Sequence, residues 1–577
     1  MSADNKLQPT GSPGSAVGDE KYNTTVEQVQ VSKWQSFKDS FKPADLSHID
    51  DPNLTDVERA ALATANDPLS RRLKSRHLQM IAIGGAIGTG LFVGSGSTLR
   101  TGGPAALIIG FSIIGLMLYC TVQALGELAV TFPVSGAFAT YSTRFIDPAW
   151  GFAMGWNYGV QWLVVLPLEL VAASITIGYW NSPVNPAAWV AIFYAIVVTI
   201  NMFGVKGYGE AEFVFSIIKV TAVIGFIILG IILNCGGGPQ GGYIGAKYWY
   251  DPGAFSNSFK GVCSVFVNAA FSFTGTELVG LAAAETENPR KSLPSAAKQV
   301  FWRICLFYIV SLTLVGLLVP YDDPHLMGSS SVDATASPFV IAIQNAGIGG
   351  LPSVINVVIM IAVLSVGNSA VYGCSRTLAS LASQGFAPKI LAYVDRTGRP
   401  LVCIGITMVF GLLCFVVASD KQQEVFDWLM ALTGLSLIFT WGSVCLCHIR
   451  FRRALKLKGR GTDELAFTSQ VGVVGSWIGF IINILVLIAQ FWIALFPVGE
   501  SPDPAAFFQK YLAFPIVVVF YAFWKIYKKP PFVHTRNIDV DTGRREMDLD
   551  LLKQEVAEEK AYIRSRGWWY RTYKFWC

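Results

Sequence analysis

The chain has 577 residues, of which 52% are apolar and only 14% are charged, and its formal net charge is +5. A soluble domain typically carries about 25% charged residues, so the composition excludes an ordinary soluble enzyme and favours an integral membrane protein. The small positive charge gives no support to nucleic-acid binding, because Lys and Arg gather in the loops between apolar segments.

Twelve apolar segments are long enough to cross a bilayer, for which a helix needs roughly 20 residues. In chain order they are residues 80–99, 105–131, 150–180, 187–205, 213–233, 262–284, 303–319, 351–381, 401–418, 425–447, 474–496 and 511–527. The predicted fold is therefore all-α, with twelve transmembrane helices. The uncharged stretch 334–375 is too long for one span, so a short surface helix is predicted before the eighth span, separated from it by the glycines of 347–350.

The charges of the loops predict the topology. Lys and Arg are frequent in alternate loops and before the first span, which places both termini in the cytoplasm. Residues 1–75 are polar and are predicted to be a disordered cytoplasmic tail, which leaves the sequons at Asn23 and Asn53 unused. Residues 76–527 are predicted to form the twelve-helix membrane domain, and 528–577 a second cytoplasmic tail with an amphipathic helix at 544–566.

Two of the spans are interrupted by glycine in mid-membrane, where lipid cannot satisfy a free backbone group. The first contains "GGAIGTG" at 84–90, and the sixth contains "FSFTGTE" at 271–277. Five spans separate the two breaks, so two inverted repeats are predicted at about 78–235 and 260–448, with spans eleven and twelve peripheral. A close-packing face of small residues would explain the first glycine cluster alone. A nucleotide-binding loop is excluded, because no Gly-Lys-Ser/Thr follows the glycines.

The two kinds of group that a broken helix frees indicate a class of substrate. Freed N–H groups lie at the positive end of a half-helix and attract an anion, whereas freed carbonyls attract a cation. A zwitterion with a carboxylate close to an ammonium satisfies both. The breaks therefore favour an amino-acid-like substrate over a sugar or a nucleobase.

Three longer motifs carry a resemblance to a known family. They are "HLQMIAIGGAIGTGLFVGSG" at 77–96, "GELAVTFPVSGAFATY" at 126–141 and "FSFTGTELVGLAAAETENPRKSLPSAAKQVFWR" at 271–303. The chain resembles the fungal amino-acid permeases of the amino acid, polyamine and organocation superfamily, from about Arg71 to the final Phe-Trp-Cys. The resemblance implies a LeuT-like fold of two five-helix inverted repeats. The sixth-span motif and the chain end look most like the broad-range general amino-acid permeases.

The resemblance also implies roles for residues of the two breaks. Thr89 and Gly90, preceded by Gly88, would bind the substrate carboxylate. The carbonyls of Ala86, Phe271 and Thr274, with Ser272 beside them, would bind its ammonium, and Phe271 would gate the site. The wall for the substrate side chain would be formed by Asn368, Ala431 and Thr433.

Three ionisable residues inside spans are candidates for proton coupling. A lysine in mid-bilayer is costly, and Lys219 resembles the lysine that replaces a sodium ion in proton-coupled relatives. The alternative is a structural lysine paired with backbone carbonyls. Glu277 could accept a proton or bind the freed amides, and Glu169 could line the pocket or bind a hydroxyl. Glu127 is expected to be structural.

No metal site or cofactor is expected, and the coupling ion would be the proton. The five histidines are expected in tails or loops, which leaves no acid-base cluster at membrane depth and argues against a membrane enzyme. As the last residue, Cys577 cannot be prenylated but could be palmitoylated. The resemblance further implies ubiquitin-driven endocytosis through tail lysines, for which the candidates are Lys6, Lys21, Lys33, Lys38 and Lys42.

The sequence thus predicts a plasma-membrane importer of amino acids with broad specificity, working by proton symport and alternating access. A narrower amino-acid permease and a non-transporting sensor of the same fold are the alternatives. The N-terminal tail is shorter than that of the sensors of this family, which argues against the second alternative.

Overall fold

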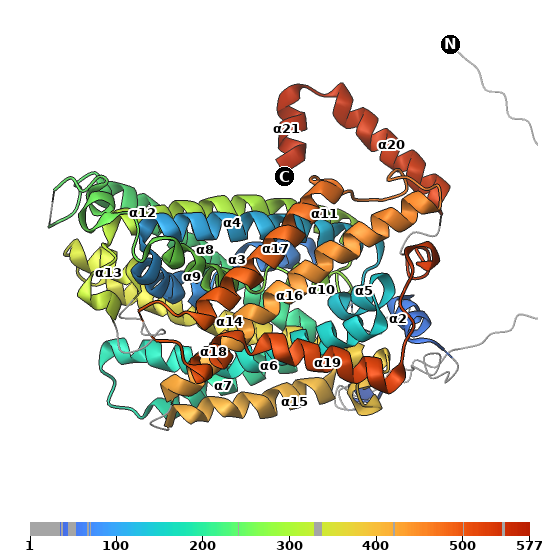
Figure 1. Ribbon diagram of the computed structural model, residues 1–577, viewed down its shortest axis with the longest axis horizontal. Coiled ribbons are helices and arrows are strands. Elements are labelled where there is room, and N and C mark those ends of the chain that lie inside the picture. Colours follow the sequence, from blue (N-terminus) through green and yellow to red (C-terminus); the bar gives the residue numbers. More distant parts are fainter. Residues whose placement is uncertain are drawn as a thin grey trace, which may run out of the picture.

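A computed structural model describes residues 35, 39–43, 54–65, 69, 71–134, 136–240, 242–327, 337–418, 422–499, 501–544 and 548–576. Within these residues the regular structure is helical, and the β pairing consists of two isolated bridges, Pro43 with Asp395 and Leu73 with Thr286. Figure 1 shows the long helices lying side by side along the long axis of the molecule, with α12 and α13 at one end and α2 and α5 at the other.

The helices of the first half of the chain are α2 (Asp56–Ala65), α3 (Ser75–Gly84), η2 (Gly90–Gly94), α4 (Ser95–Thr131), α5 (Ala137–Phe145), α6 (Pro148–Ile177), η3 (Gly178–Trp180), α7 (Pro186–Met202), α8 (Gly204–Asn234), η4 (Trp249–Gly253), α9 (Ser258–Ser272) and α10 (Leu278–Ala282). Those of the second half are α11 (Pro289–Arg303), η5 (Ile304–Val310), α12 (Ser311–Leu318), η6 (Pro324–Met327), α13 (Pro338–Asn345), α14 (Leu351–Ser383), η8 (Lys389–Ala392), α15 (Leu401–Gly411), η9 (Leu412–Ala418), α16 (Gln422–Leu457), α17 (Gly472–Leu495), α18 (Pro504–Tyr511), α19 (Ala513–Lys528), η10 (Thr535–Asn537), α20 (Leu549–Ser565) and α21 (Trp568–Trp576).

Seven helices in the described part of the chain are long and apolar enough to cross a membrane, and the bent pair α18 and α19 makes an eighth. The predicted all-helical membrane class is confirmed. The sixth predicted span fails the length criterion because its break divides it into α9 and α10. The first is likewise divided, and its second half is joined to the second span within α4, where Gly103 (φ 83°) makes a kink before Pro104.

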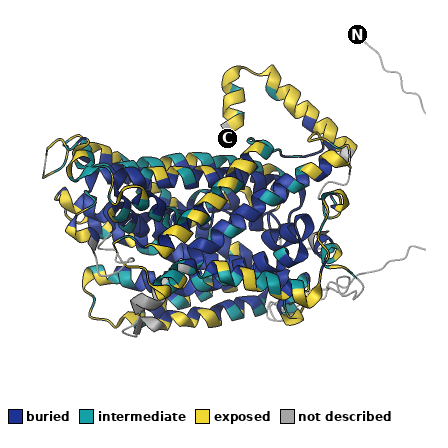
Figure 2. Ribbon diagram, viewed as in Figure 1, coloured by how far each residue is buried: buried dark blue, intermediate teal, exposed yellow. Residues whose placement is uncertain are grey.

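The exposure of side chains separates central from peripheral helices (Figure 2). The apolar windows of α6 and α14 are 78% buried, whereas those of α8 and α17 are only 33% buried. On α17, Ile481, Leu485 and Ile488 recur at helical spacing and are more than half exposed. Exposing a continuous apolar stripe of this kind to water is unfavourable, so the stripe faces lipid.

Both ends of the chain pack against the same end of the bundle. Helix α2 contacts α5 and α14, and its Ala60 and Ala61 are buried. The prediction of a disordered tail over 1–75 is therefore wrong for residues 56–65. The helix has the sequence DVERAALATA, and the small side chains of Ala60 and Ala61 lie on its buried side.

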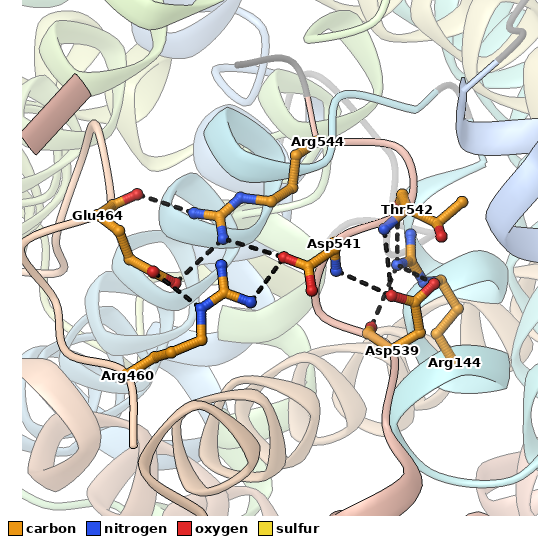
Figure 3. Close-up of polar contacts among 7 residues, drawn as sticks. All are labelled: Arg144, Arg460, Glu464, Asp539, Asp541, Thr542 and Arg544. Atoms are coloured by element: carbon orange, nitrogen blue, oxygen red, sulfur yellow. Dashed lines mark hydrogen bonds and ion pairs between the residues drawn. The ribbon is translucent and has the colours of Figure 1, made fainter. Parts of the chain in front are cut away.

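The segment after α19, residues 532–544, packs against the end of the bundle that the loop charges predict to face the cytoplasm. We call this segment the C-terminal strap. Its Ile538 and Val540 belong to the main hydrophobic core. Figure 3 shows its polar contacts with α5 and with the loop between α16 and α17. On the α5 side, the buried Arg144 donates to the Thr542 carbonyl (2.8 Å).

The other side of the strap is held by ion pairs. Arg544 donates to Glu464 Oε1 (3.0 Å) and to the Glu464 carbonyl (2.8 Å), and Arg460 donates to Asp541 Oδ1 (2.6 Å). Burial lowers the pKa of Arg144 to about 10, so its guanidinium stays charged at neutral pH. The strap therefore joins α5 to the loop between α16 and α17, two segments that lie more than 300 residues apart in the sequence.

Beyond the strap, α20 lies where the sequence predicts an amphipathic helix. It projects from the bundle with α21 (Figure 1). Arg290 of α11 pairs with Glu555 (2.7 Å), and Lys298 donates to the Lys574 carbonyl. The exposed rings of Trp568, Trp569 and Tyr573 suit a membrane interface, as the sequence predicts.

Arg544→Ala is expected to destabilise the folded protein by about 2 kcal/mol, because it removes one of the two arginines that pair with the buried Glu464 carboxylate, the other being Arg460. Thermal unfolding in detergent measures this. Arg536→Ala is the matched control, since Arg536 is exposed and forms no hydrogen bond or ion pair in the described structure. Equal stability of the two variants would show that the strap is not a structural brace.

Candidate functional site

The two breaks predicted from the sequence are present, and they lie against each other. Helix α3 ends at Gly84 before the helical turns resume at about Thr89, and α9 ends at Ser272 before α10 begins at Leu278. A Cβ atom on Gly90 would lie 2.3 Å from Ser272 Cα, and one on Gly275 would lie 3.2 Å from the Gly85 carbonyl oxygen. Only glycine allows backbones to approach this closely, so the breaks form one site.

The first break presents donors at the start of its second half. Phe92 N–H donates to the Gly88 carbonyl (3.2 Å), the first bond of the resumed helix. The N–H groups of Thr89, Gly90 and Leu91 therefore fall in the first turn, where intrahelical acceptors are missing. The Thr89 hydroxyl donates to Glu169 of α6, and both side chains are buried. Of the two interpretations of Glu169, the structure favours the one in which it binds a hydroxyl of the site.

The second break presents acceptors and two polar atoms without partners. Gly275, at φ 95°, turns the chain between Thr274 and Glu277. The Phe271 carbonyl accepts from Thr274 N–H (3.0 Å), and Phe273 N–H is shared between it and the Ala270 carbonyl. Within the described residues, Thr274 Oγ1 and Glu277 Oε2 are buried without a hydrogen-bond partner. An unpaired buried polar atom is costly, so these two atoms are candidates to bind a ligand or a water molecule.

Glu277 itself is held inside the bundle. Its Oε1 accepts from the Tyr158 hydroxyl (3.3 Å) and from Gly275 N–H (3.4 Å). The second contact is the bond to a freed amide that the sequence analysis left open for this residue. It leaves Oε2 available to a second group.

The seventh predicted span supplies two side chains that link the breaks. The Tyr308 hydroxyl lies 2.8 Å from the Ala86 carbonyl oxygen and 2.9 Å from that of Ser272. The buried Arg303 donates to the Ala82 carbonyl (2.5 Å), at the end of α3, and to the Thr276 hydroxyl. Its positive charge lies at the negative pole of α3, where a cation is favourable. Arg303 immediately precedes the π-helical segment η5 and Tyr308 lies within it, and such a distortion often marks a functional site.

Lys219 lies in a buried ion pair beside the first break. Its Nζ donates to Ser365 Oγ (2.7 Å) and to Glu212 Oε1 (3.2 Å). The Ser365 hydroxyl in turn donates to Glu212 Oε2 (2.6 Å), and Ser216 bridges Glu212 to the Met80 carbonyl of α3. The partner of the lysine is thus a carboxylate, and the alternative of pairing with backbone carbonyls is wrong.

On the side of the bundle away from the strap, a cavity of about 320 Å³ reaches Phe271. Its lining includes Thr98 and Thr101 of α4, Asn268 of α9 and Met430 of α16. Arg450 of α16 donates to the Val533 carbonyl of the strap. Met430 and Arg450 lie about 30 Å apart along α16 at 1.5 Å per residue, so the cavity and the strap are at opposite ends of the bundle. Phe271 lines this cavity and is also the first residue of the second break, which is the position expected of the predicted gate.

Comparison with known proteins identifies the family. The family described as amino acid permease matches residues 77–537. The chain belongs to this family. The permease is 66% identical to the general amino-acid permease GAP2 of Candida albicans, over 94% of this chain and 93% of that protein.

Two further relatives show the range of the family. The general amino-acid permease GAP1 of Saccharomyces cerevisiae is 64% identical over 95% of this chain and 92% of its own length. The histidine permease of the same yeast is 55% identical over 89% of this chain and 86% of its own length. The predicted resemblance is confirmed, and these relatives are permeases and not enzymes.

Only some of the residues predicted to surround the substrate side chain lie near the two breaks. Thr433 is buried on α16 next to Gly434, where an added Cβ would lie 2.7 Å from Val267 and 3.9 Å from Phe271 Cβ, so this part of α16 lies beside the second break. Asn368 accepts from Asn201 Nδ2 of α7 (2.8 Å). Its α14 neighbour Val366 contacts the first break instead, 2.5 Å from a Cβ on Gly88. The side chain of Ala431 lies outside the described residues.

The prediction that the histidines lie in tails or loops is wrong for two of them. His77 is buried in α3, and His448 is buried in α16, with its Nε2 2.9 Å from Glu127 Oε1. Arg452 donates to both oxygens of the same carboxylate (2.5 and 2.8 Å). The error arose because α16 continues to Leu457, ten residues past the predicted end of its span. The enclosed Glu127 supports the structural role expected for it.

Tyr308→Phe is expected to lower the rate of amino-acid uptake by the permease about tenfold. It removes the hydroxyl that donates to the Ala86 and Ser272 carbonyls and so connects the two breaks. The lost hydrogen bonding amounts to about 1–2 kcal/mol. Initial uptake rates at saturating substrate measure the effect. Tyr194→Phe, which removes a hydroxyl bonded to the Met408 carbonyl in the periphery, is the control and keeps the wild-type rate.

Proposed function

We propose that the permease is a plasma-membrane importer of amino acids with broad specificity, driven by proton symport and working by alternating access. In this proposal twelve spans cross the membrane, and the first ten form two inverted repeats of five, with both termini in the cytoplasm. The general amino-acid permeases among its relatives support the substrate class and the breadth of specificity.

The observation that carries the proposal is the contact between the two breaks. The first break brings helix N-terminal amides beside Thr89, and the second brings carbonyls and the unpaired Thr274 hydroxyl. A carboxylate is stabilised by the former and an ammonium by the latter. One α-amino acid spans both sets, which is why neither break would be a site by itself.

The buried Lys219 and Glu212 pair supports proton coupling. Lys219 Nζ is linked through Ser365 and Glu212 to Ser216 and the last turn of α3, so its charge state acts directly on the first break. Glu169, which is bonded to Thr89, is close enough for its charge to interact with Lys219. We propose that Lys219 exchanges the coupling proton, with Glu169 and Glu277 as further acceptors.

The tails supply the proposed regulation by ubiquitin and endocytosis. Lys42 is exposed and pairs with Asp39 (2.7 Å). The other candidate lysines, 6, 21, 33 and 38, lie outside the described residues, as does Cys577, the proposed palmitoylation site.

Uptake into proteoliposomes tests the proposal. With the interior about one pH unit more alkaline than the outside, a labelled neutral amino acid should accumulate up to roughly tenfold if one proton moves with each substrate. A sodium gradient of the same size should produce no accumulation. Binding without flux would instead indicate a sensor, and accumulation driven by sodium alone would refute the proton mechanism.

A further inference from the structure

A buried histidine lies in the first turn of α3, at the end of the bundle that the loop charges predict to face the cytoplasm. The side chain of His77 is 1% exposed, and its Nε2 lies 3.2 Å from Oε1 of Glu210 on α8. Glu210 is 43% exposed and also pairs with the exposed Arg76 (2.5 Å). The imidazole is therefore connected to solvent through the Glu210 carboxylate.

The two ring nitrogens of His77 have different surroundings. Nδ1 accepts from the Lys74 N–H (3.3 Å), which places the proton of the neutral ring on Nε2. Nε2 lies 3.2 Å from the Glu210 carboxylate and 3.2 Å from Arg76 Nε. With its proton Nε2 donates to the carboxylate, and without it Nε2 accepts from the guanidinium. This nitrogen therefore has a partner both before and after it gives up a proton.

The other ring nitrogen faces the helix that carries the buried ion pair. A Cβ atom on Gly209 of α8 would lie 3.2 Å from His77 Nδ1. Glu212, the partner of Lys219, follows Gly209 by three residues on the same face of α8, about 4.5 Å along the helix. The Nδ1 atom thus lies about one helical turn from Glu212.

The contacts of Ser216 give the same spacing on α3. The Ser216 hydroxyl lies 3.3 Å from Glu212 Oε1 and donates to the Met80 carbonyl (3.1 Å). Met80 follows His77 by three residues, which again is about 4.5 Å along a helix. The imidazole therefore lies between the buried Glu212 and the solvent-exposed Glu210.

The charges around the imidazole come from three elements. Glu210 of α8 acts on it, as do Arg76 and Lys74 at the start of α3. On the side of α10, Glu285 pairs with Arg376 of α14 (3.2 Å). His77 precedes the first predicted span, and burial lowers its pKa although Glu210 opposes the shift. The ring is therefore neutral near neutral pH, so it passes on a proton that it receives.

We propose that His77 and Glu210 form the cytoplasmic exit for the coupling proton. A proton moves from Glu212, which receives it from Lys219, to His77 Nδ1. The Nε2 proton then passes to the Glu210 carboxylate and from there to water, and a half-turn of the ring restores the first tautomer. The inference rests on the proposed function, since it names the residues through which the coupling proton leaves.

A comparison of net uptake with exchange tests the proposal. Net uptake releases a proton for each substrate, whereas exchange of labelled for unlabelled amino acid at equal concentrations needs no net release. His77→Gln keeps a hydrogen-bonding side chain that cannot titrate. In proteoliposomes of the full-length permease it should lower the initial rate of net uptake about tenfold and leave the exchange rate within about twofold.

Two further variants accompany His77→Gln. Glu210→Gln removes the acceptor of the proton at a partly exposed position, where folding is least affected, and should lower net uptake but not exchange. His534→Gln is the matched control, because His534 is an exposed histidine of the strap, and it should change neither rate.

The outcomes separate this inference from the function on which it rests. If Glu210→Gln and His77→Gln lower net uptake and exchange equally, or lower neither, the proton exit is overturned and the two residues are structural. If His77→Gln does not fold, the two rates of Glu210→Gln decide in the same way. A wild-type permease whose net uptake moves no proton overturns the proposed proton symport as well.

Discussion

Replacement of Lys219 by methionine is expected to abolish accumulation of amino acids against their gradient. The substitution keeps the length of the side chain but removes the charge that pairs with Glu212, and no group at this position could then exchange a proton. We expect the steady-state accumulation ratio to fall from roughly tenfold to one under a gradient of about one pH unit. Labelled uptake at steady state in proteoliposomes measures it.

The buried partner of Lys219 requires a control for folding. In Lys219→Met the Glu212 carboxylate stays buried without its cation, a loss of about 3–5 kcal/mol that could unfold the protein. The double variant Lys219→Met/Glu212→Gln removes both charges and should recover most of this stability. It should let the amino acid equilibrate across the membrane without concentrating it. Accumulation by either variant would refute the coupling role.

Gly90→Ala is expected to eliminate substrate binding, although it adds a single methyl group. The new Cβ would lie 2.3 Å from Ser272 Cα and 2.8 Å from Ser272 N, so backbone would meet backbone and the two breaks would have to separate. Separation moves the donors of the first break away from the acceptors of the second. We expect the Kd for a labelled amino acid to rise at least 100-fold, as measured by equilibrium binding in nanodiscs.

Gly94→Ala is the matched control for this variant. Gly94 lies in the same segment η2, but the nearest atom to its added Cβ is the Thr89 carbonyl oxygen at 3.9 Å, an ordinary contact. The Kd of this variant should stay within about twofold of the wild-type value. If Gly90→Ala also binds normally, the close approach of the breaks is not needed for the site.

The sequence predicted the breaks because their cause is local. Glycine clusters at 84–90 and 275, inside spans that are otherwise apolar, allow the backbone to leave the helix whatever surrounds them. The short helix before the eighth span was predicted for the same reason, since Gly347 and Gly350 take positive φ where α13 is divided from α14. Its predicted place on the surface is wrong, because residues 338–343 of α13 are buried against the bundle. The Gly103 kink within α4 falls between two predicted spans.

The residues that the sequence did not single out act through contacts between distant segments. Arg303 reaches the end of α3 across more than 200 residues, and Tyr308 reaches both breaks. Nothing local distinguishes them from an arginine at the end of a span or a tyrosine within one. Glu212 carried a weak signal, because it lies two helical turns before Lys219 on one face of α8.

The most direct test of the account measures both fluxes in the same vesicles. Proteoliposomes with a trapped pH indicator and an external labelled amino acid report proton and substrate entry together. The account predicts that adding substrate to vesicles without an imposed gradient acidifies the interior, with one proton for each amino acid taken up. Amino-acid entry without acidification would contradict proton symport.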